Sequence, residues 1–193
     1  MIVQNRLRFV FMLFVGIICA ESSKAADVPK NLFDFSQADQ AAKWQIVNDG
    51  VMGGRSRSQA SVTDSGHLRF AGTLSLENNG GFASVRSRPR PLGLTSGETI
   101  VMRVKGDGRR YTFNLYTPDR RTAFSYQADF VTKSGEWTEV RLPVRNFVAH
   151  SFGRRVEGMG LDPTRVQSIG ILLGDKRAGP FEILIDWIRV EFQ

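Results

Sequence analysis

The chain has 193 residues, a formal net charge of +7, two histidines and a single cysteine, Cys19. This length suits one domain with a sizeable core. The basic residues are scattered rather than clustered, which argues against a nucleic-acid-binding surface, and one cysteine cannot form an intramolecular disulfide. Without a cluster of histidines or cysteines the sequence offers no zinc site, so we expect no metal and no cofactor.

Residues 1–25 have the pattern of a secretory signal peptide. A basic start with Arg6 and Arg8 precedes an apolar run over 9–20, and small residues then allow cleavage after Ala25. We therefore expect the protein to be exported and periplasmic, with Cys19 lost. The alternative is an uncleaved membrane anchor, although the apolar run is shorter than the roughly 20 residues that a spanning helix needs.

The remainder is predicted to contain a short linker, residues 26–31, and one β-sandwich domain, residues 32–193. Near the start of the domain, residues 36–42 suit one or two helical turns with Ser36 as the N-cap.

Almost every later segment alternates with a period of two, which is typical of antiparallel strands with one buried and one solvated face. The alternating segments are 68–76, 100–105, 111–116 and 124–130. Three further strands are predicted at 137–142, 166–173 and 181–192, and the second of these, the most apolar, should be central in its sheet.

The last predicted strand changes parity along its length. Ile183, Ile185 and Trp187 share one face, whereas Ile188 and Val190 share the other. A period of two cannot keep both sets on one side, so we expect a bulge near Trp187.

Turns rich in Asn, Asp, Ser and Gly separate these strands. Many short strands with such turns indicate an all-β jelly-roll sandwich with at most one or two short helices. The longest segment predicted to be irregular is 145–163, which is either an ordered functional loop or a mobile connection.

One loop has an unusual composition. The segment Asn48-Asp-Gly-Val-Met-Gly-Gly-Arg-Ser56 holds three glycines, which permit positive φ and close backbone approach, and Asn48 and Asp49 can cap backbone amides. It is either a loop that shapes a binding surface or a complicated turn between strands. A phosphate loop is excluded because no Gly-Lys-Ser/Thr follows.

Further blocks follow in order: Leu74-Ser-Leu-Glu-Asn-Asn-Gly-Gly-Phe-Ala-Ser-Val-Arg86, Val104-Lys-Gly-Asp-Gly-Arg109 and Gly174-Asp-Lys-Arg-Ala-Gly-Pro-Phe181. Together these blocks resemble the complex I intermediate-associated protein 30 family over about residues 32–192. The resemblance implies a galactose-binding-like jelly roll without established catalytic residues. For mitochondrial members it also implies a role as assembly factors for respiratory complex I, from which the predicted export signal departs.

The resemblance also supplies the candidate binding residues. They are Asn48, Asp49, Gly50, Met52, Gly53, Gly54, Arg55, Ser56, Gly80, Gly81, Phe82, Arg86, Gly106, Asp107, Gly108, Arg109 and Lys176. We expect the loops 48–56, 78–84 and 106–109 to pack at one rim of the sandwich. Basic side chains beside Met52 and Phe82 favour a protein partner, such as a subunit of a membrane complex.

Other functions have weaker support in the sequence. No nucleophile elbow or other catalytic motif is present, so we expect a protein that is not an enzyme. A carbohydrate-binding module is the main alternative, with Tyr116 as an aromatic platform because it shares a face with polar neighbours. Trp44, Trp137 and Tyr126 are predicted to be core residues instead.

A structural calcium ion is a further, weak alternative. Asp34 and Asp186, in the first and last strands, are the candidate ligands, but calcium takes about 6–8 oxygen ligands.

Overall fold

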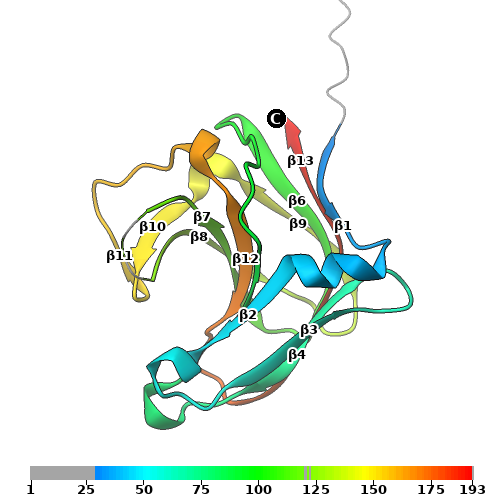
Figure 1. Ribbon diagram of the computed structural model, residues 1–193, viewed down its shortest axis with the longest axis vertical. Helices are drawn as coiled ribbons and strands as arrows, with labels where there is room; N and C mark the ends of the chain where they lie inside the picture. Colours follow the sequence, from blue (N-terminus) through cyan, green and yellow to red (C-terminus); the bar gives the residue numbers. More distant parts are fainter. Residues whose placement is uncertain (1–28, 120, 122, 193) are drawn as a thin grey trace, which may run out of the picture.

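The computed structural model describes residues 29–119, 121 and 123–192, which form two antiparallel sheets packed face to face (Figure 1). The six-stranded sheet has the order β3-β4-β13-β6-β9, and β1 also pairs with β13. Its strands are β1 (Lys30–Asp34), β3 (Arg57–Val62), β4 (Leu68–Leu74), β6 (Glu98–Lys105), β9 (Trp137–Pro143) and β13 (Gly179–Phe192). The predicted all-β sandwich is confirmed.

The seven-stranded sheet has the order β11-β10-β8-β7-β12-β5-β2. It curves, and its concave side faces away from the six-stranded sheet (Figure 1). Its strands are β2 (Trp44–Asn48), β5 (Ala83–Ser87), β7 (Arg110–Tyr116), β8 (Phe124–Val131), β10 (Val148–Ser151), β11 (Arg154–Arg155) and β12 (Ser168–Leu173).

Helical structure in the described residues is confined to five short 3-10 segments. They are η1 (Ala38–Lys43), η2 (Asp49–Met52), η3 (Glu77–Asn79), η4 (Val144–Asn146) and η5 (Pro163–Arg165). None of the helices in this part of the chain has the length and apolar character needed to cross a membrane.

The predicted cap of the first helical turn is wrong. The turn begins at Ala38, and Gln37 occupies the N-cap position without a side-chain hydrogen bond. The Ser36 hydroxyl does not cap the turn, because it donates a hydrogen bond to Asp34 Oδ1 at 2.7 Å.

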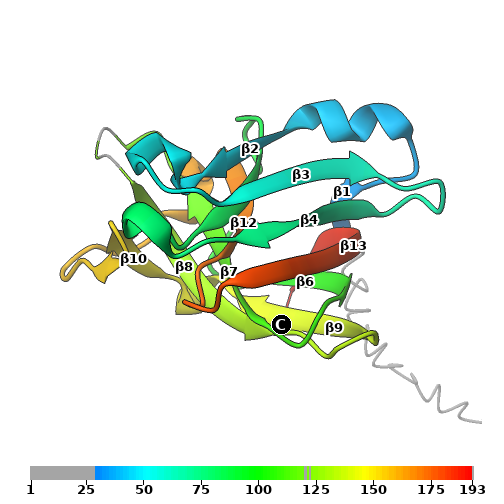
Figure 2. The same ribbon diagram turned by 90° about the horizontal axis from the view of Figure 1, so that it is seen from below.

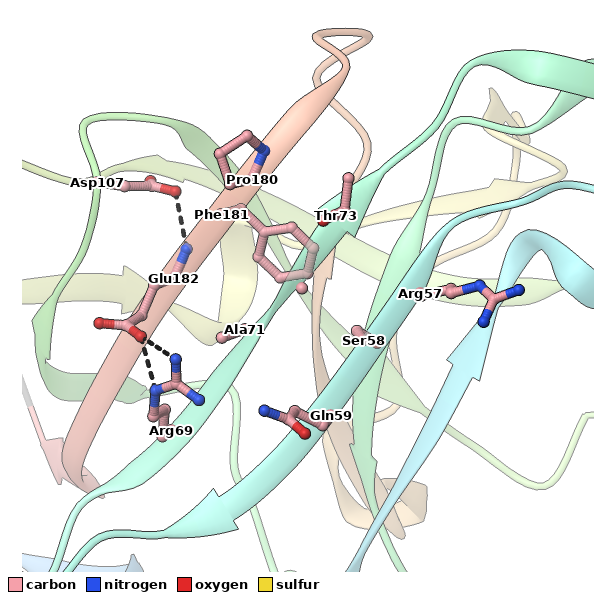
Figure 3. Close-up of a pocket in the computed structure, with 11 residues that line it drawn as sticks. Arg57, Ser58, Gln59, Arg69, Ala71, Thr73, Asp107, Pro180, Phe181 and Glu182 are labelled. Carbon is pink, nitrogen blue, oxygen red and sulfur yellow. Dashed lines mark hydrogen bonds and ion pairs between the residues drawn. The ribbon is translucent and has the colours of Figure 1, made fainter.

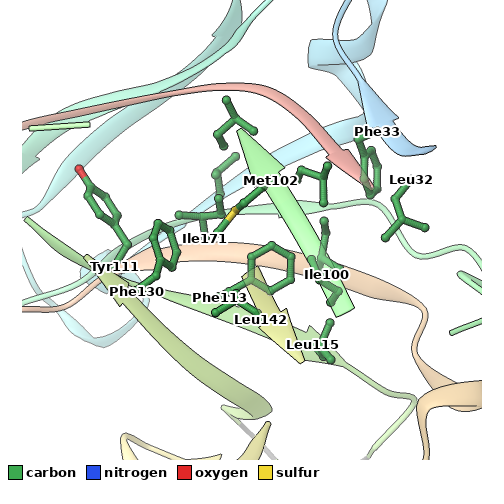
Figure 4. Close-up of a cluster of buried hydrophobic side chains, with 14 of the residues drawn as sticks. Leu32, Phe33, Ile100, Met102, Tyr111, Phe113, Leu115, Phe130, Leu142 and Ile171 are labelled. Atoms are coloured by element: carbon green, nitrogen blue, oxygen red, sulfur yellow. The ribbon is translucent and has the colours of Figure 1, made fainter. Parts of the chain in front are cut away.

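The core lies between the two sheets, with β12 near the centre of the curved sheet. Ile169, Ile171 and Leu173 of β12 are fully buried, and β12 pairs with β7 on one side and β5 on the other. Figure 4 shows the side chains of Ile171, Phe113 and Met102 filling the space between strands of opposite sheets. The central position predicted for this segment is confirmed.

The long strand β13 contains the predicted irregularity. Its register against β6 shifts between Ile185 and Trp187. Before the shift β13 pairs with β4, and after it β13 pairs with β1. The bulge lets Ile183 and Ile185 face the core before it and Ile188 and Val190 face the core after it, which explains the change of parity.

Several boundaries differ from the prediction. β1 begins at Lys30, inside the predicted linker 26–31, and the predicted irregular segment 145–163 contains the β10–β11 hairpin. Strands β2, β3 and β5 were not predicted. β2 and β5 have five residues each, and the inward face of β3 carries small or polar side chains such as Ser58, whose hydroxyl donates to Asn48 of β2, so its alternation is weak. The predicted signal peptide, residues 1–25, lies outside the described residues.

Neighbouring residues of β12 test the assignment of its two faces. Ile171 is fully buried in the core, whereas Leu172 is partly exposed on the outer face. We expect Ile171→Ala to lower the free energy of unfolding by about 2–5 kcal/mol, because it leaves a cavity. Leu172→Ala should cost less than half as much. Denaturant unfolding followed by tryptophan fluorescence measures both, and equal losses would contradict the assigned faces.

Candidate functional site

The carboxylate of Asp49 joins two loops of the resembling blocks at one end of the sandwich. Asp49 is fully buried at the start of η2. Its Oδ1 accepts a hydrogen bond from the Ser56 amide at 2.9 Å, and its Oδ2 accepts one from the Ser56 hydroxyl at 2.5 Å. Oδ2 also accepts the amides of Gly81 and Phe82, at 2.7 and 3.3 Å. One side chain therefore fixes the loop 49–56 against the loop 80–82.

Glycines surround Asp49 because there is no space for side chains there. A Cβ at Gly54 would overlap the Asp49 carboxyl group, and one at Gly80 would lie 2.7 Å from Asp49 Oδ2. Gly53 is needed for another reason: its φ of 86° lies in the left-handed region, and its N–H closes the turn on Gly50 O at 3.2 Å. The glycines of this motif therefore allow the backbone to enclose the carboxylate.

The hydrogen bonds to Asp49 decide its charge state. Burial raises the pKa of Asp49, but the hydrogen bonds from Ser56, Gly81 and Phe82 together lower it by more, so the pKa lies below its ordinary value of 3.8. The side chain is thus a buried carboxylate at neutral pH, held by amides and a hydroxyl.

Arg109 makes a second buried cluster. The side chains of Arg109 and Asp175 are 6% and 7% exposed. The guanidinium donates to both Asp175 oxygens, at 3.0 and 2.6 Å, and to the carbonyls of Arg177 and Pro180. This fork fixes the connection between β12 and β13. The hydrogen bond with Asp175 raises the pKa of Arg109. Burial raises the pKa of Asp175, but the bond with Arg109 and that from the Arg177 amide lower it by more, so both groups are charged.

Asp107 completes this cluster. Its carboxylate accepts the Tyr111 hydroxyl at 3.1 Å, the Glu182 amide at 3.0 Å and the Arg109 amide at 3.1 Å. Burial and the nearby Asp107 charge raise the pKa of Tyr111, which keeps its hydroxyl protonated as a donor. The turn 106–109 is thereby tied to the start of β13.

The β12–β13 connection brings the two clusters together. A Cβ on Gly174 would lie 3.7 Å from Gly81 O, so the connection lies against the loop fixed by Asp49. Figure 2 shows the short coil after β2 beside the coil after β4 at one end of the molecule, as does Figure 1. The structure therefore places the loops 48–56, 78–84 and 106–109 at one rim.

The basic residues predicted to face a partner have different environments. Arg55 is exposed and paired with Glu77 at 2.6 Å, and Lys176 is exposed on the β12–β13 connection. Arg109 is buried in its cluster, so the prediction that it contacts a partner is wrong: the Asp175 fork and two carbonyls occupy it. Arg86 lies mid-strand on the outer face of the curved sheet, opposite Gly170, rather than on the rim.

The rim carries exposed apolar residues, of which only Met52 was predicted from the sequence. Met52 is 52% exposed, as predicted for a contact residue, while Phe82 is partly buried. Val51 and Leu76, not predicted, are 73% and 46% exposed. We call Val51, Met52 and Leu76 the rim patch. The signal for Val51 was available in the sequence, since two adjacent apolar residues between glycines are unusual in a turn.

The aromatic candidates separate into core and surface residues. Trp44 and Tyr126 are buried, and the Tyr126 hydroxyl donates to Gly160 O at 2.9 Å. Trp137 is partly buried against His67, with ring centroids 4.8 Å apart. Tyr116 lies on the outer face of the curved sheet with Asn114, as predicted from its parity.

The geometry does not support the calcium alternative. Asp34 and Asp186 line one hollow, but Asp186 pairs with Arg103 at 2.5 Å and Asp34 accepts hydrogen bonds from Ser36. In the part of the chain that the structure describes, no three His, Cys, Asp or Glu side chains group in a way that suits a metal ion.

A broad hollow lies over the outer face of β3, β4 and β13 (Figure 3). Across it Arg69 pairs with Glu182 at 2.5 Å, and Asp107 accepts the Glu182 amide. Arg69 and Glu182 neutralise each other, and Asp107 is already hydrogen-bonded to the backbone. The hollow is therefore a weaker candidate for a binding site than the rim.

The low pKa of Asp49 predicts how the free energy of unfolding depends on pH. Because the folded-state pKa is depressed, the carboxylate stabilises the fold above about pH 4, and this contribution is lost as the pH falls through the folded-state value. Asp49→Asn should lower the free energy of unfolding at pH 7 by about 3 kcal/mol, because the amide cannot accept every donor. Denaturant unfolding at several pH values should show the difference between wild type and variant shrinking below pH 4.

The exposed turn residue Asp64 is the matched control, and Asp64→Asn should leave stability nearly unchanged. A difference between wild type and Asp49→Asn that is independent of pH would contradict the assigned role of the charge.

The two adjacent glycines predict unequal effects of added side chains. Gly54→Ala should destabilise strongly, because its Cβ overlaps the Asp49 carboxyl group. Gly53→Ala has nothing within 4 Å of the new Cβ, and should cost only the left-handed backbone strain, about 1 kcal/mol. Thermal denaturation of both variants measures the difference. The reverse order would show that Asp49 does not fill the space beside Gly54.

Comparison with known proteins places the chain in a family. The family model for complex I intermediate-associated protein 30 matches residues 33–185. The relative of that name from Neurospora crassa is 26% identical over 91% of this chain and 79% of its own length. The relatives from Drosophila melanogaster and Mus musculus are 28% and 29% identical over 83% and 82% of this chain. The chain spans only 62% and 55% of their lengths.

Solved structures of low identity share the fold. The family 11 carbohydrate-binding module of a Clostridium thermocellum cellulase superposes with a TM-score of 0.64 at 15% identity, covering 88% of this chain and 97% of that chain. A family 30 module from the same organism gives a TM-score of 0.55 at 12% identity, covering 86% and 98%. At these identities the likeness shows the jelly-roll fold alone.

These findings correct one prediction. The expectation of an exported, periplasmic protein is contradicted, because the three relatives are all named as mitochondrial proteins. The pattern in residues 1–25 lies before the matched region, and a targeting segment is independent of the packing of the domain that follows it. Since the match covers most of the chain, from β1 into β13, the chain belongs to the complex I intermediate-associated protein 30 family.

Proposed function

We propose that the chain is a non-catalytic, assembly-factor-like module that binds a protein in an intermediate of respiratory complex I through the rim patch. Family membership supports the complex I context, since the relatives carry that association in their names. The observation that carries the proposal is the exposure of Val51 and Met52 on a loop that Asp49 holds in one conformation.

Exposed apolar side chains on an ordered loop suit a binding surface. Val51 and Met52 lose contact with water only when another surface covers them, and such contacts supply binding free energy. Because Asp49 already orders the loop, a partner would lose little conformational entropy of this chain on binding. Methionine also adapts its shape to the surface that it contacts.

Exposed basic side chains occur on the same rim as the rim patch. Arg55 and Lys176 are exposed, and Arg177 is exposed beside Lys176. An apolar centre with a polar edge is the usual arrangement of a protein interface. Because Glu77 pairs with Arg55, the net positive charge comes from Lys176 and Arg177, which favour an acidic region on the partner and would set the orientation more than the affinity.

The internal hydrogen bonding of the site supports a role without catalysis. The side chains of Asp49, Asp107 and Asp175 are all engaged by backbone or side-chain donors that fix loops. A catalytic carboxylate needs an oxygen that can reach a substrate, and these groups are used to shape the rim.

Met52 and Phe152 allow a matched test, because they are 52% and 61% exposed. Phe152 lies in the β10–β11 hairpin, and its amide donates to Ala123 O beside the start of β8, whereas the loop 106–109 contacts Thr132 after the opposite end of β8. Met52→Glu should reduce co-migration of the tagged full chain with complex I subunits on native gels at least fivefold, because it places a charge at the centre of the interface. Phe152→Glu should leave co-migration unchanged.

The gel bands are identified by mass spectrometry, and thermal unfolding shows whether each variant is folded. Equal co-migration of both variants with complex I subunits would place the interface elsewhere. The absence of any complex I subunit with the folded wild-type chain would contradict the proposed context.

A further inference from the structure

The concave face of the curved sheet carries polar side chains that are buried although they point away from the core. Asn114 is 1% exposed, Ser84 is fully buried and Ser125 is 4% exposed. Their parity places them opposite the core residues of the same strands, such as Phe113 and Val85. This face is therefore a preformed polar surface with an ordered floor.

Hydrogen bonds fix the side chains of this floor. Gln127 donates to the Ser125 hydroxyl at 3.1 Å, which donates to Asn114 Oδ1 at 2.9 Å, and Asn114 donates to Thr112 O at 3.2 Å. The chain of donors crosses from β8 to β7. Such a network holds its outer amide groups in place before any ligand arrives.

Tyr116 and Arg86 meet beside this floor, over Gly170. The guanidinium of Arg86 lies 4.9 Å from the centroid of the Tyr116 ring. A Cβ at Gly170 would lie 3.1 Å from the Tyr116 ring and 3.2 Å from Arg86 Cγ. The glycine therefore lets both side chains lie close to the sheet, where they form a partly buried pair.

Part of the hydrogen-bonding capacity of this pair is left for a ligand. Arg86 Nε donates a hydrogen bond to the Ser84 hydroxyl at 3.3 Å. In the part of the chain that the structure describes, no carboxylate pairs with the Arg86 guanidinium. By contrast Arg110, on the same face, has Asp129 at 4.0 Å. Burial raises the pKa of Tyr116, so its hydroxyl is a donor at neutral pH. The pair offers terminal guanidinium N–H groups, a hydroxyl and an aromatic edge.

We propose that this face is a second binding site, separate from the rim, for a sugar ring that carries a negative charge. The unpaired guanidinium of Arg86 would bind the carboxylate or phosphate in a forked geometry. The edge of the Tyr116 ring would contact the carbon face of the sugar, and the amide of Gln127, held by the buried floor, would meet its hydroxyls. Acidic saccharides and sugar phosphates share this chemistry.

The proposal is independent of the protein interface, because Arg86 and Tyr116 lie on strands, toward the ends of β5 and β7 that are away from the rim, and the rim patch lies on loops. Amide chemical shifts of the labelled full chain, titrated with glucuronate, glucose 6-phosphate and glucose, test it directly. We expect shifts centred on Gly170 and the ends of β5 and β7. Glucose should bind at least about tenfold more weakly than the tighter of the two anions, and the comparison of the anions shows whether carboxylate or phosphate is preferred.

Variants separate the contributions. Arg86→Gln should remove the preference for the anions, and Arg86→Lys should keep part of it because the charge remains. Tyr116→Ala should weaken binding of all three compounds. Arg110→Gln is the matched control on the same face and should change nothing.

Three results would overturn the proposal in variants whose spectra show an intact fold. They are the absence of shifts on this face at millimolar concentration with every probe, equal affinity for glucose and the anions, and unchanged anion binding by Arg86→Gln.

Discussion

The arrangement of the rim depends on one buried carboxylate. Asp49 accepts hydrogen bonds from Ser56, Gly81 and Phe82, and these residues lie on two loops that follow different strands. A buried charge is unfavourable unless such donors compensate it, and here they compensate it enough to lower its pKa. The motif requires glycine at positions 54 and 80, because the Asp49 carboxyl group leaves no space there for a Cβ. The motif is therefore a structural device for enclosing a charge.

The rest of the rim follows from this constraint. Once the loop after β2 is fixed, Val51 and Met52 stay in solvent, because the turn that encloses Asp49 leaves them on its outer side. The Arg109–Asp175 pair fixes the neighbouring β12–β13 connection in the same way. The forked bonds to Asp175, together with the bond to Pro180 O, allow the Arg109 side chain one arrangement against this connection. Binding groups can then be displayed on loops that cost little entropy to order, while the concave sheet face remains free for a different ligand.

The sequence predicted those parts of the structure that depend on periodic burial. The parity of Tyr116 against Phe113, the central place of β12 and the bulge before Trp187 all follow from which face of a strand is apolar. Strands β2, β3 and β5 lacked that signal, because small or polar residues occupy part of their inward faces. The capping role of Asp49 was anticipated from its residue type. The burial of Arg109 was not anticipated. Its partner Asp175 is 66 residues away, and no local sequence pattern predicts a pair at that separation.

Amide hydrogen exchange tests the central claim most directly. In the wild-type chain the amides of Ser56 and Gly81, which donate to Asp49, should exchange as slowly as other hydrogen-bonded amides of the sandwich. In Asp49→Asn both should approach the rate of unprotected amides, while those of Ile169 and Ile171 in β12 stay protected. Equal protection of Ser56 and Gly81 in the two proteins would show that the loops are ordered without the carboxylate, and would contradict the account.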